Sequence, residues 1–171
     1  MEFDSIDLKL LAELQRDCTP SLAELAEKVG SSKSVCGRRI QQLVDAGVIR
    51  GRAAVLDQEK VGLGITVFAH VKMKKHDSQS LENFADFMFR YPQVLECHTM
   101  MGDFDFLLKI IVPSVADYKD FFWESLSKAQ GVQEVNSSIC LVSSCVTTEL
   151  PLSYLSGELG LSGELGGQPR A

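Results

Sequence analysis

Residues 21–47 read SLAELAEKVGSSKSVCGRRIQQLVDAG, and this stretch decides the fold of the first third of the chain. Ser21 and Glu24 form a capping box, because each side chain can accept a hydrogen bond from the other residue's backbone amide. This box predicts a short helix that ends at Gly30, a residue suited to the left-handed position after a helix. Ser32 then caps a longer helix, whose inner face carries Cys36, Ile40, Leu43 and Val44. A short helix, a tight glycine turn and a longer basic helix are typical of a helix-turn-helix.

A further helix precedes this pair. Asp4 can cap it, and its apolar residues recur every three or four positions, which gives it one buried face: Ile6, Leu10, Leu11 and Leu14. The segment 17–20 ends in Pro20 and breaks the helix. We therefore predict a winged-helix-like helix-turn-helix domain over residues 1–53.

The charge of this region differs from that of the whole chain. The chain has 17 basic and 23 acidic side chains, a net charge of −6 and a pI near 5.1. Residues 28–52 nevertheless carry six basic side chains against the single acid Asp45, a local charge of +5. A confined basic stripe on an acidic protein suggests contact with a polyanion. A solvated helix face would give the same composition.

The outward face of the longer helix carries the candidate DNA contacts. In a helix-turn-helix this helix enters the major groove, where Arg and Lys suit guanine and Gln suits adenine. We predict DNA contacts from Ser32, Lys33, Ser34, Val35, Gly37, Arg38, Arg39, Gln42, Arg50 and Arg52. Glycine inside a helix costs about 1 kcal/mol relative to alanine, so Gly37 indicates close approach to DNA or close helix packing. An unrelated three-helix bundle explains charge and spacing equally well.

The remainder alternates strand and helix patterns. After a linker strand over residues 54–63, we predict the order βαββαβ over residues 64–152. The strands are expected at 65–74, 94–101, 104–112 and 132–146, with helices beginning near Ser80 and Ser114. This order is typical of a ferredoxin-like α+β domain, an antiparallel sheet with two helices on one face. Residues 153–171 contain LSGELG twice in succession, which predicts a flexible low-complexity tail.

The predicted sheet leaves one face without helices. Phe68, His70 and alternate positions of the other strands would lie on it, and exposed apolar surface of this size usually marks an interface. We therefore expect a homodimer formed through the open sheet face. A symmetric dimer would also present two helix-turn-helix units to a palindromic DNA site.

Composition excludes several classes of protein. No stretch approaches the about 20 apolar residues of a membrane span, and the first residues do not form a secretory signal. The five cysteines are odd in number without a Cys-x-x-Cys, so we expect reduced, mostly buried thiols and a cytoplasmic protein. No metal-ligand spacing, catalytic triad or phosphate loop occurs. We predict neither a metal site nor an enzyme.

Several motifs follow one another in the order found in one family of regulators. They are DLKLLAELQ at 7–15, LAELAEKVG at 22–30, RRIQQL at 38–43, GVIRG at 47–51, ECH at 96–98, MGDFDFLLK at 101–109, VP at 112–113 and GV at 131–132. From about residue 3 to Leu152 the chain resembles the Lrp/AsnC (feast/famine) transcriptional regulators. The resemblance implies a regulator that binds double-stranded DNA, forms dimers and often octameric rings of four dimers, and responds to a small effector, usually an amino acid.

The resemblance also indicates an effector site near the turn 102–105, between dimers. An amino-acid ammonium group needs an anion, which Asp103 or Asp105 could supply, while its carboxylate needs donors. The candidate effector residues are Thr99, Met101, Gly102, Asp103, Phe104, Asp105, Ser137 and Ser138. Alternatively, the acids merely fix the turn. Met101 stands where the family commonly has Thr or Ser, and Ser137 where it commonly has Thr, so the pocket's size and polarity should differ.

Three functions of different classes remain open from the sequence. The first is a sequence-specific transcription factor regulated by an amino acid, with no cofactor beyond that effector. The second is an architectural DNA-wrapping protein with little effector response. The third, an amino-acid-metabolising enzyme with a sensor domain, is the weakest because no catalytic set is present.

Overall fold

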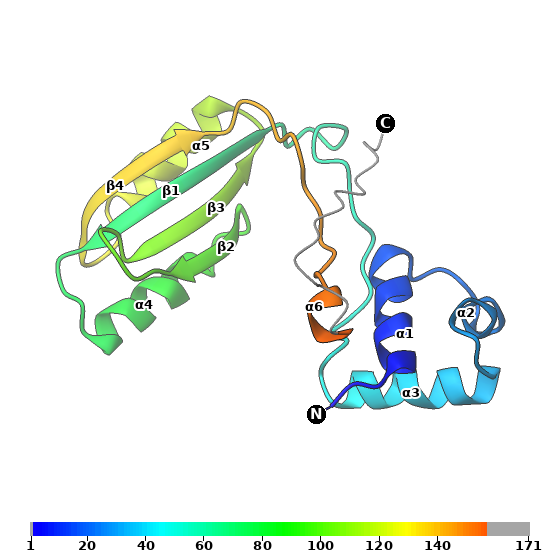
Figure 1. Cartoon of the computed structure of the whole chain (residues 1–171). Coiled ribbons are helices and arrows are strands. Elements are labelled where there is room, and N and C mark those ends of the chain that lie inside the picture. Colours follow the sequence, from blue (N-terminus) through cyan, green and yellow to red (C-terminus); the bar gives the residue numbers. More distant parts are fainter. Residues whose placement is uncertain (1, 157–171) are drawn as a thin grey trace. The chain divides into compact units, whose positions relative to one another are not determined.

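The computed structural model describes residues 2–156, which form two units. The first consists of residues 2–54 together with 145–156, and the second of residues 55–144. The first unit contains α1 (Ser5–Arg16), α2 (Leu22–Val29), α3 (Lys33–Asp45) and the short α6 (Ser153–Ser156). The second contains β1 (Ile65–Met73), α4 (Ser78–Met88), β2 (Val94–Thr99), β3 (Phe106–Val112), α5 (Val115–Phe121), the π-helical turn η1 (Phe122–Leu126) and β4 (Val132–Ile139) (Figure 1).

The helices α1, α2 and α3 begin directly after the predicted capping residues. Asp4 caps α1 in a capping box with Asp7, and Ser21 caps α2 in the box with Glu24. Gly30 follows α2 with a φ of 67°, the left-handed conformation that favours glycine. The inner faces of α1, α2 and α3 pack together through Leu10, Leu25, Ala26, Val29, Cys36 and Ile40. The predicted helix-turn-helix is confirmed.

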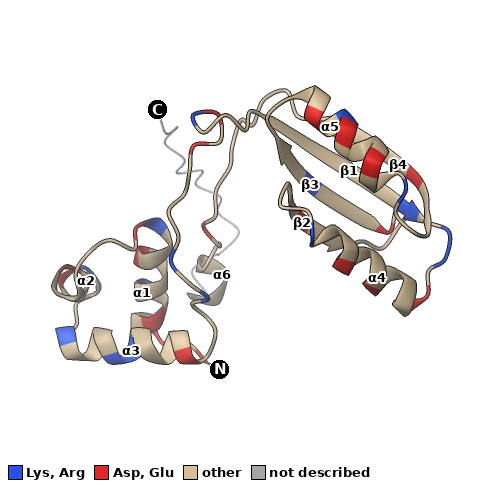
Figure 2. Cartoon of the chain, turned by 180° about the vertical axis from the view of Figure 1, so that it is seen from behind, with Lys and Arg blue, Asp and Glu red and all other residues tan. Residues whose placement is uncertain are grey.

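The second unit is the predicted βαββαβ sheet. Its strands are antiparallel in the order β2-β3-β1-β4, so β2 and β4 are the edge strands. Both α4 and α5 lie on the same face of the sheet. Figure 2, which is turned by 180° from Figure 1, shows this face with the helices in front of the strands. Between helices and sheet lies a core that includes Val67, Ala69, Val71, Phe84, Met88, Phe106, Leu108, Ile110, Tyr118, Phe121 and Leu126. The predicted ferredoxin-like fold is confirmed.

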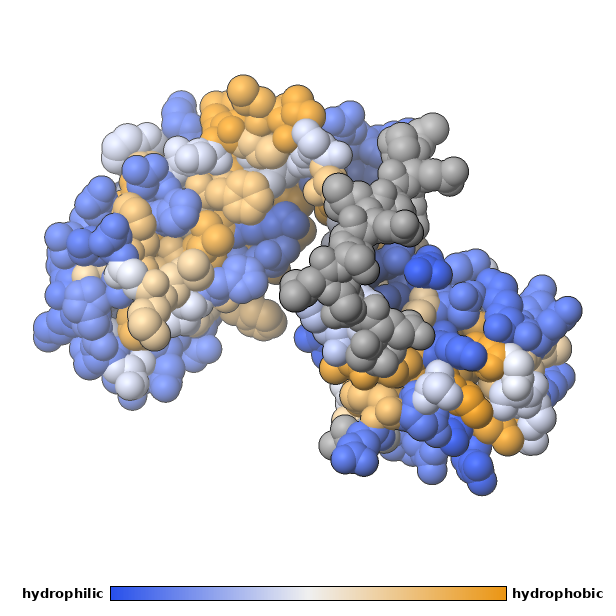
Figure 3. All heavy atoms as spheres, in the orientation of Figure 1, coloured by the Kyte–Doolittle hydropathy of each residue, from blue (hydrophilic) through white to orange (hydrophobic). Residues whose placement is uncertain are grey.

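The other face of the sheet is open, as predicted, but its composition is mixed. Phe68 of β1 lies between Lys109 and Ser138 in the two neighbouring strands. Leu107 is half-buried, and Lys109 Nζ forms an ion pair with Glu96 Oε1 at 3.0 Å. Figure 3 views this face and shows apolar patches among hydrophilic side chains. The open face is therefore less apolar than the strand pattern alone suggested.

The segments that join the two units differ from the prediction. Residues 51–56 form no strand, and 57–62 form a turn in which Asp57 accepts from the amide of Lys60. The predicted linker strand is wrong because these residues have no neighbouring strand within the described chain. The last strand ends at Ile139 rather than 146. Residues 145–152, predicted as part of the second domain, group with the first unit, and 153–156 form α6 instead of a tail. Most of the LSGELG repeat lies outside the described residues.

The cysteines also differ from the prediction. All five are free thiols, but only Cys36 is buried, and Cys97 and Cys145 are exposed. Cys97 lies on β2, an edge strand of the described sheet. The prediction of mostly buried thiols is wrong.

Candidate functional site

The outward face of α3 carries exposed polar and basic side chains, of which the Ser34 hydroxyl lies 3.2 Å from that of Ser32. Lys33, Ser34, Arg38 and Gln42 are all exposed, and the Ser32 side chain caps the helix by accepting from the amide of Val35 at 3.3 Å. Within residues 2–156, neither Lys33 nor Arg38 forms an ion pair. Figure 2 shows Lys and Arg segments in blue along α3. This surface therefore offers free positive charge and hydrogen-bond donors to a ligand outside the chain.

Arg39 occupies a different place from its neighbour Arg38. Its Nη1 lies 2.6 Å from Asp4 Oδ2 and 2.9 Å from Asp7 Oδ1, so the guanidinium joins α3 to the start of α1. These carboxylates raise the pKa of Arg39, chiefly through the hydrogen bond to Asp7. Only 24% of the side chain is exposed. These ion pairs place the charge of Arg39 inside the unit, since position 39 lies beside the inner residues Cys36 and Leu43, and they indicate a packing role beside the predicted DNA contact.

Gly37 is half-buried, on the side of α3 that faces Leu22 of α2. A Cβ atom at this position would meet only Leu22 Cδ1, at 3.4 Å, which is an ordinary van der Waals distance. Helix packing therefore does not require glycine here. Of the two explanations that the sequence offers, close approach to DNA is the one that this geometry favours.

Arg50 and Arg52 follow the helices in an exposed segment without regular structure. Neither forms an ion pair with a described residue. Together with Val35, which is half-buried at the start of α3, they complete the predicted DNA-contact set. Apart from Arg39, the structure leaves the charged members of that set accessible.

In the second unit, Asp105 fixes the turn that was predicted to bind the effector. Its Oδ2 accepts from the amide of Met73 at 2.7 Å, and its Oδ1 lies 2.7 Å from His76 Nδ1. Burial raises the pKa of Asp105, but the Met73 and His76 hydrogen bonds outweigh it and hold this pKa below its ordinary value. Since both oxygens already have partners, Asp105 anchors the turn to the end of β1. Asp103, which is exposed, is the better candidate for an ammonium ligand.

The remaining turn residues are accessible from outside. Gly102 has a φ of 144°, and Thr99, Met101 and Asp103 are exposed. Phe104 packs against the ring of His70 on the open sheet face, with centroids 5.2 Å apart. A ligand that approaches the turn would meet these side chains first.

Ser137 and Ser138 do not act from the same side. Ser137 lies opposite Ala69 on the helix-covered face and hydrogen bonds the hydroxyl of Tyr118, whereas Ser138 lies opposite Phe68 on the open face. Both are on the edge strand β4, and Thr99 is on the other edge strand, β2. Three strand spacings separate these edges by about 14 Å. The predicted effector residues therefore do not converge on one amino acid within a single chain.

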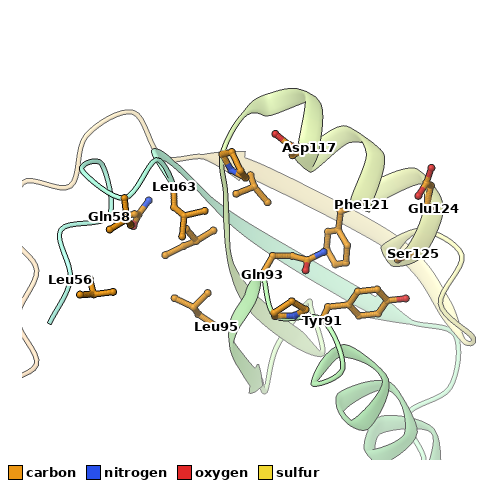
Figure 4. Close-up of a pocket in the computed structure, with 15 residues that line it drawn as sticks. Leu56, Gln58, Leu63, Tyr91, Gln93, Leu95, Asp117, Phe121, Glu124 and Ser125 are labelled. Carbon is orange, nitrogen blue, oxygen red and sulfur yellow. The ribbon is translucent and has the colours of Figure 1, made fainter. Parts of the chain in front are cut away.

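The second unit also contains an apolar pocket of about 770 Å³ that sequence reasoning missed. It lies at the end of the sheet opposite the turn 102–105, beside the last residues of β3. Figure 4 shows Leu56 and Leu63 on the side of the linker turn and Tyr91 and Phe121 on the opposite side. Among the described residues, no basic side chain lines it. The clue in the sequence was the run of aliphatic residues in the segment assigned only as a linker.

Two further features are absent from the part of the chain that the structure describes. No group of three or more His, Cys, Asp or Glu side chains there is placed to hold a metal ion. No helix there has the length and apolar character needed to cross a membrane.

Comparison with known proteins agrees with both units. The family model for winged helix-turn-helix DNA-binding matches residues 3–50, and the model for the Lrp/AsnC ligand binding domain matches residues 66–150. The chain is 38% identical over 149 residues to the DNA-binding transcriptional activator DecR of Escherichia coli, covering 87% of this chain and 98% of that protein. It is 37% identical to the glutamate uptake regulatory protein of Zymomonas mobilis, with 91% and 94% covered.

A solved structure shows the same relationship. A transcriptional regulator from Neisseria meningitidis, in complex with L-Met, superposes with a TM-score of 0.85 at 37% identity, covering 90% of this chain and 99% of that one. The two family models together cover most of the chain, and the curated relatives match over nearly their whole length. The chain belongs to the Lrp/AsnC family and is a DNA-binding transcriptional regulator with a ligand-binding domain.

Proposed function

We propose that this regulator binds specific double-stranded DNA through the outward face of α3, as a homo-oligomer, and that an amino acid changes this binding. The observation that supports the DNA contact is the difference between the surroundings of two adjacent arginines. Arg39 is held by two carboxylates, whereas Arg38 is exposed without an ion pair to any described residue. Arg38 can therefore pair with a base edge while Arg39 fixes the helix that carries it.

Exposed aliphatic side chains support a homodimer. Five of them lie in the segments that join the two units and are between 70% and 93% exposed: Val55, Leu56, Leu141, Val142 and Val146. Leu56 also borders the apolar pocket. Large aliphatic side chains this exposed indicate an interface, and a second copy of the chain is the partner that we propose. Four such dimers in an octamer remain the expectation from the family resemblance.

The separation of Thr99 and Ser137 on opposite edges of the sheet supports an effector site that two copies of the chain share. One amino acid cannot touch both residues within a chain, since they lie on opposite sheet edges. Residues of two chains can meet one ligand, with Asp103 as an anion for its ammonium group. The L-Met complex of the Neisseria regulator supports an amino acid as the ligand class. We propose no enzymatic activity, no cofactor beyond this effector and action in the cytoplasm.

The test selects DNA fragments from a random pool with the full-length protein and footprints them with and without each of the twenty amino acids. A discrete footprint that one amino acid changes supports the proposal, and light scattering of the same samples reports the oligomeric state. Extended protection of DNA that no amino acid alters would instead support an architectural DNA-wrapping protein. A monomer at micromolar concentration would contradict the interface argument.

A further inference from the structure

The segment 145–156, here called the strap, is bound to the C-terminal end of α1. Gln15 Nε2 donates to the carbonyl oxygen of Leu150 at 3.0 Å, and the Leu150 amide donates back to Gln15 Oε1 at 2.9 Å. Beside this pair, Arg16 Nε lies 3.2 Å from Glu149 Oε2. The Gln15 side chain thus pairs with the strap backbone through both its donor and its acceptor, as a neighbouring strand would.

The strap is attached without being buried. None of residues 145–155 is buried, and 68% of Leu150 and 59% of the Arg16 side chain are exposed. Exposed hydrogen bonds and ion pairs contribute little to stability, and segments with few buried contacts open locally at low free energy. The strap can therefore detach from α1 while the rest of the first unit stays folded.

The other end of α1 holds the candidate DNA-reading helix. Asp4, which caps α1, and Asp7 in its first turn both pair with Arg39 of α3. The 12 residues of α1 form one rigid element, about 18 Å long at 1.5 Å per residue. The strap is attached at one end of this element and α3 at the other. Through α1, the strap is therefore connected to Arg39, the residue next to Arg38.

We propose that the strap is a releasable link whose attachment to Gln15 and Arg16 is coupled to DNA binding. The chain runs from β4 through residues 140–144 directly into the strap. A ligand that displaces β4 consequently acts on the strap through these five residues, and on α1 through the hydrogen bonds and ion pair of the strap. The inference rests on the proposed contact of α3 with DNA. Coupling of this kind is reciprocal, so DNA must change the equilibrium constant for strap attachment by the factor by which release changes DNA affinity.

The experiment uses the full-length protein and two variants that loosen the strap from opposite sides, Gln15→Leu on the helix and Glu149→Gln on the strap. The matched control is Gln133→Leu, which removes an exposed amide from β4. Hydrogen exchange of peptides covering 145–156 measures attachment, and fluorescence anisotropy with a DNA fragment selected by the wild type measures affinity.

Both loosened variants should exchange faster in the strap and change the DNA Kd in the same direction by about fivefold or more. DNA should alter strap exchange in the wild type, and Gln133→Leu should behave as the wild type. Faster exchange with an unchanged Kd in both variants would overturn the coupling, and unchanged exchange would overturn the attachment. If the wild-type protein selects no DNA, both the proposed contact of α3 with DNA and the coupling are overturned. Hydrogen exchange of the free protein and its variants would then still show whether the strap is attached to α1.

Discussion

Asp7→Asn should destabilise the first unit, because Asp7 is the one charged residue that is buried among residues 2–156. Its carboxylate accepts from the Asp4 amide at 3.2 Å and pairs with Arg39 Nη1 at 2.9 Å, with 12% of the side chain exposed. Asparagine keeps the size and one acceptor but removes the charge. Breaking a fully buried pair costs about 3–5 kcal/mol and an exposed pair about 0.2–1 kcal/mol. Asp4 still neutralises Arg39 in the variant, so we expect about 1–2 kcal/mol.

The assay is thermal unfolding followed by circular dichroism at 222 nm. In a domain of this size, a loss of about 1 kcal/mol lowers Tm by about 4–8 °C, so the helical transition should move by about 5–15 °C. Asp45→Asn is the control, because Asp45 is exposed at the end of α3 and hydrogen bonds only Gln41 among the described residues. It should change Tm little. An Asp7→Asn protein that melts with the wild type would refute the view that the Asp7–Arg39 pair holds α1 on α3.

Four further outcomes are expected. Arg38→Ala should weaken specific DNA binding by about 1–3 kcal/mol in a titration and leave Tm unchanged. Gly37→Ala should raise Tm, since a helical alanine is favoured by about 1 kcal/mol, but should weaken DNA binding if the DNA backbone approaches here. Arg50→Ala should lower the slope of log K against log salt by about one for every DNA sequence tested. The lowered pKa of Asp105 stabilises the fold above the unfolded pKa near 4, and this is lost as pH falls through the folded value; acid titration of Asp105→Asn should show a flatter decline.

The helix-turn-helix and the βαββαβ order of elements were predictable because their signals are local. Ser21 with Glu24 and the glycine at 30 specify helix ends within a few residues. Alternation along β1 specifies which side chains enter the core, and the observed burial follows it from Val67 to Met73. The spacing of Arg39 from Cys36 and Leu43 also marked it as inward-facing. Grouping position 39 with the basic stripe by charge alone did not predict its ion pairs with Asp4 and Asp7.

Contacts between residues far apart in the sequence were not predictable from a pattern. Gln15 and Leu150 are 135 positions apart, and the residues that flank each of them form no motif that indicates this contact. The two hydrogen bonds of Asp105 likewise depend on where β1 ends and on His76 in the following loop. In the linker, aliphatic residues were interpreted as a strand, although the described chain supplies no strand beside them. The sequence determines these features only through the assembled fold.

The placement of residues 145–156 in the first unit bears on how the protein is synthesised. A ribosome that has completed α3 must still add the 90 residues of the second unit, 55–144, before the last piece of the first unit emerges. At typical elongation rates of about 5–20 residues per second, this delay is about 5–20 s. A nascent or prematurely terminated chain therefore carries α1, α2 and α3 without the segment that pairs with Gln15. Only a polypeptide that has been translated past its sensor can have the complete DNA-binding unit.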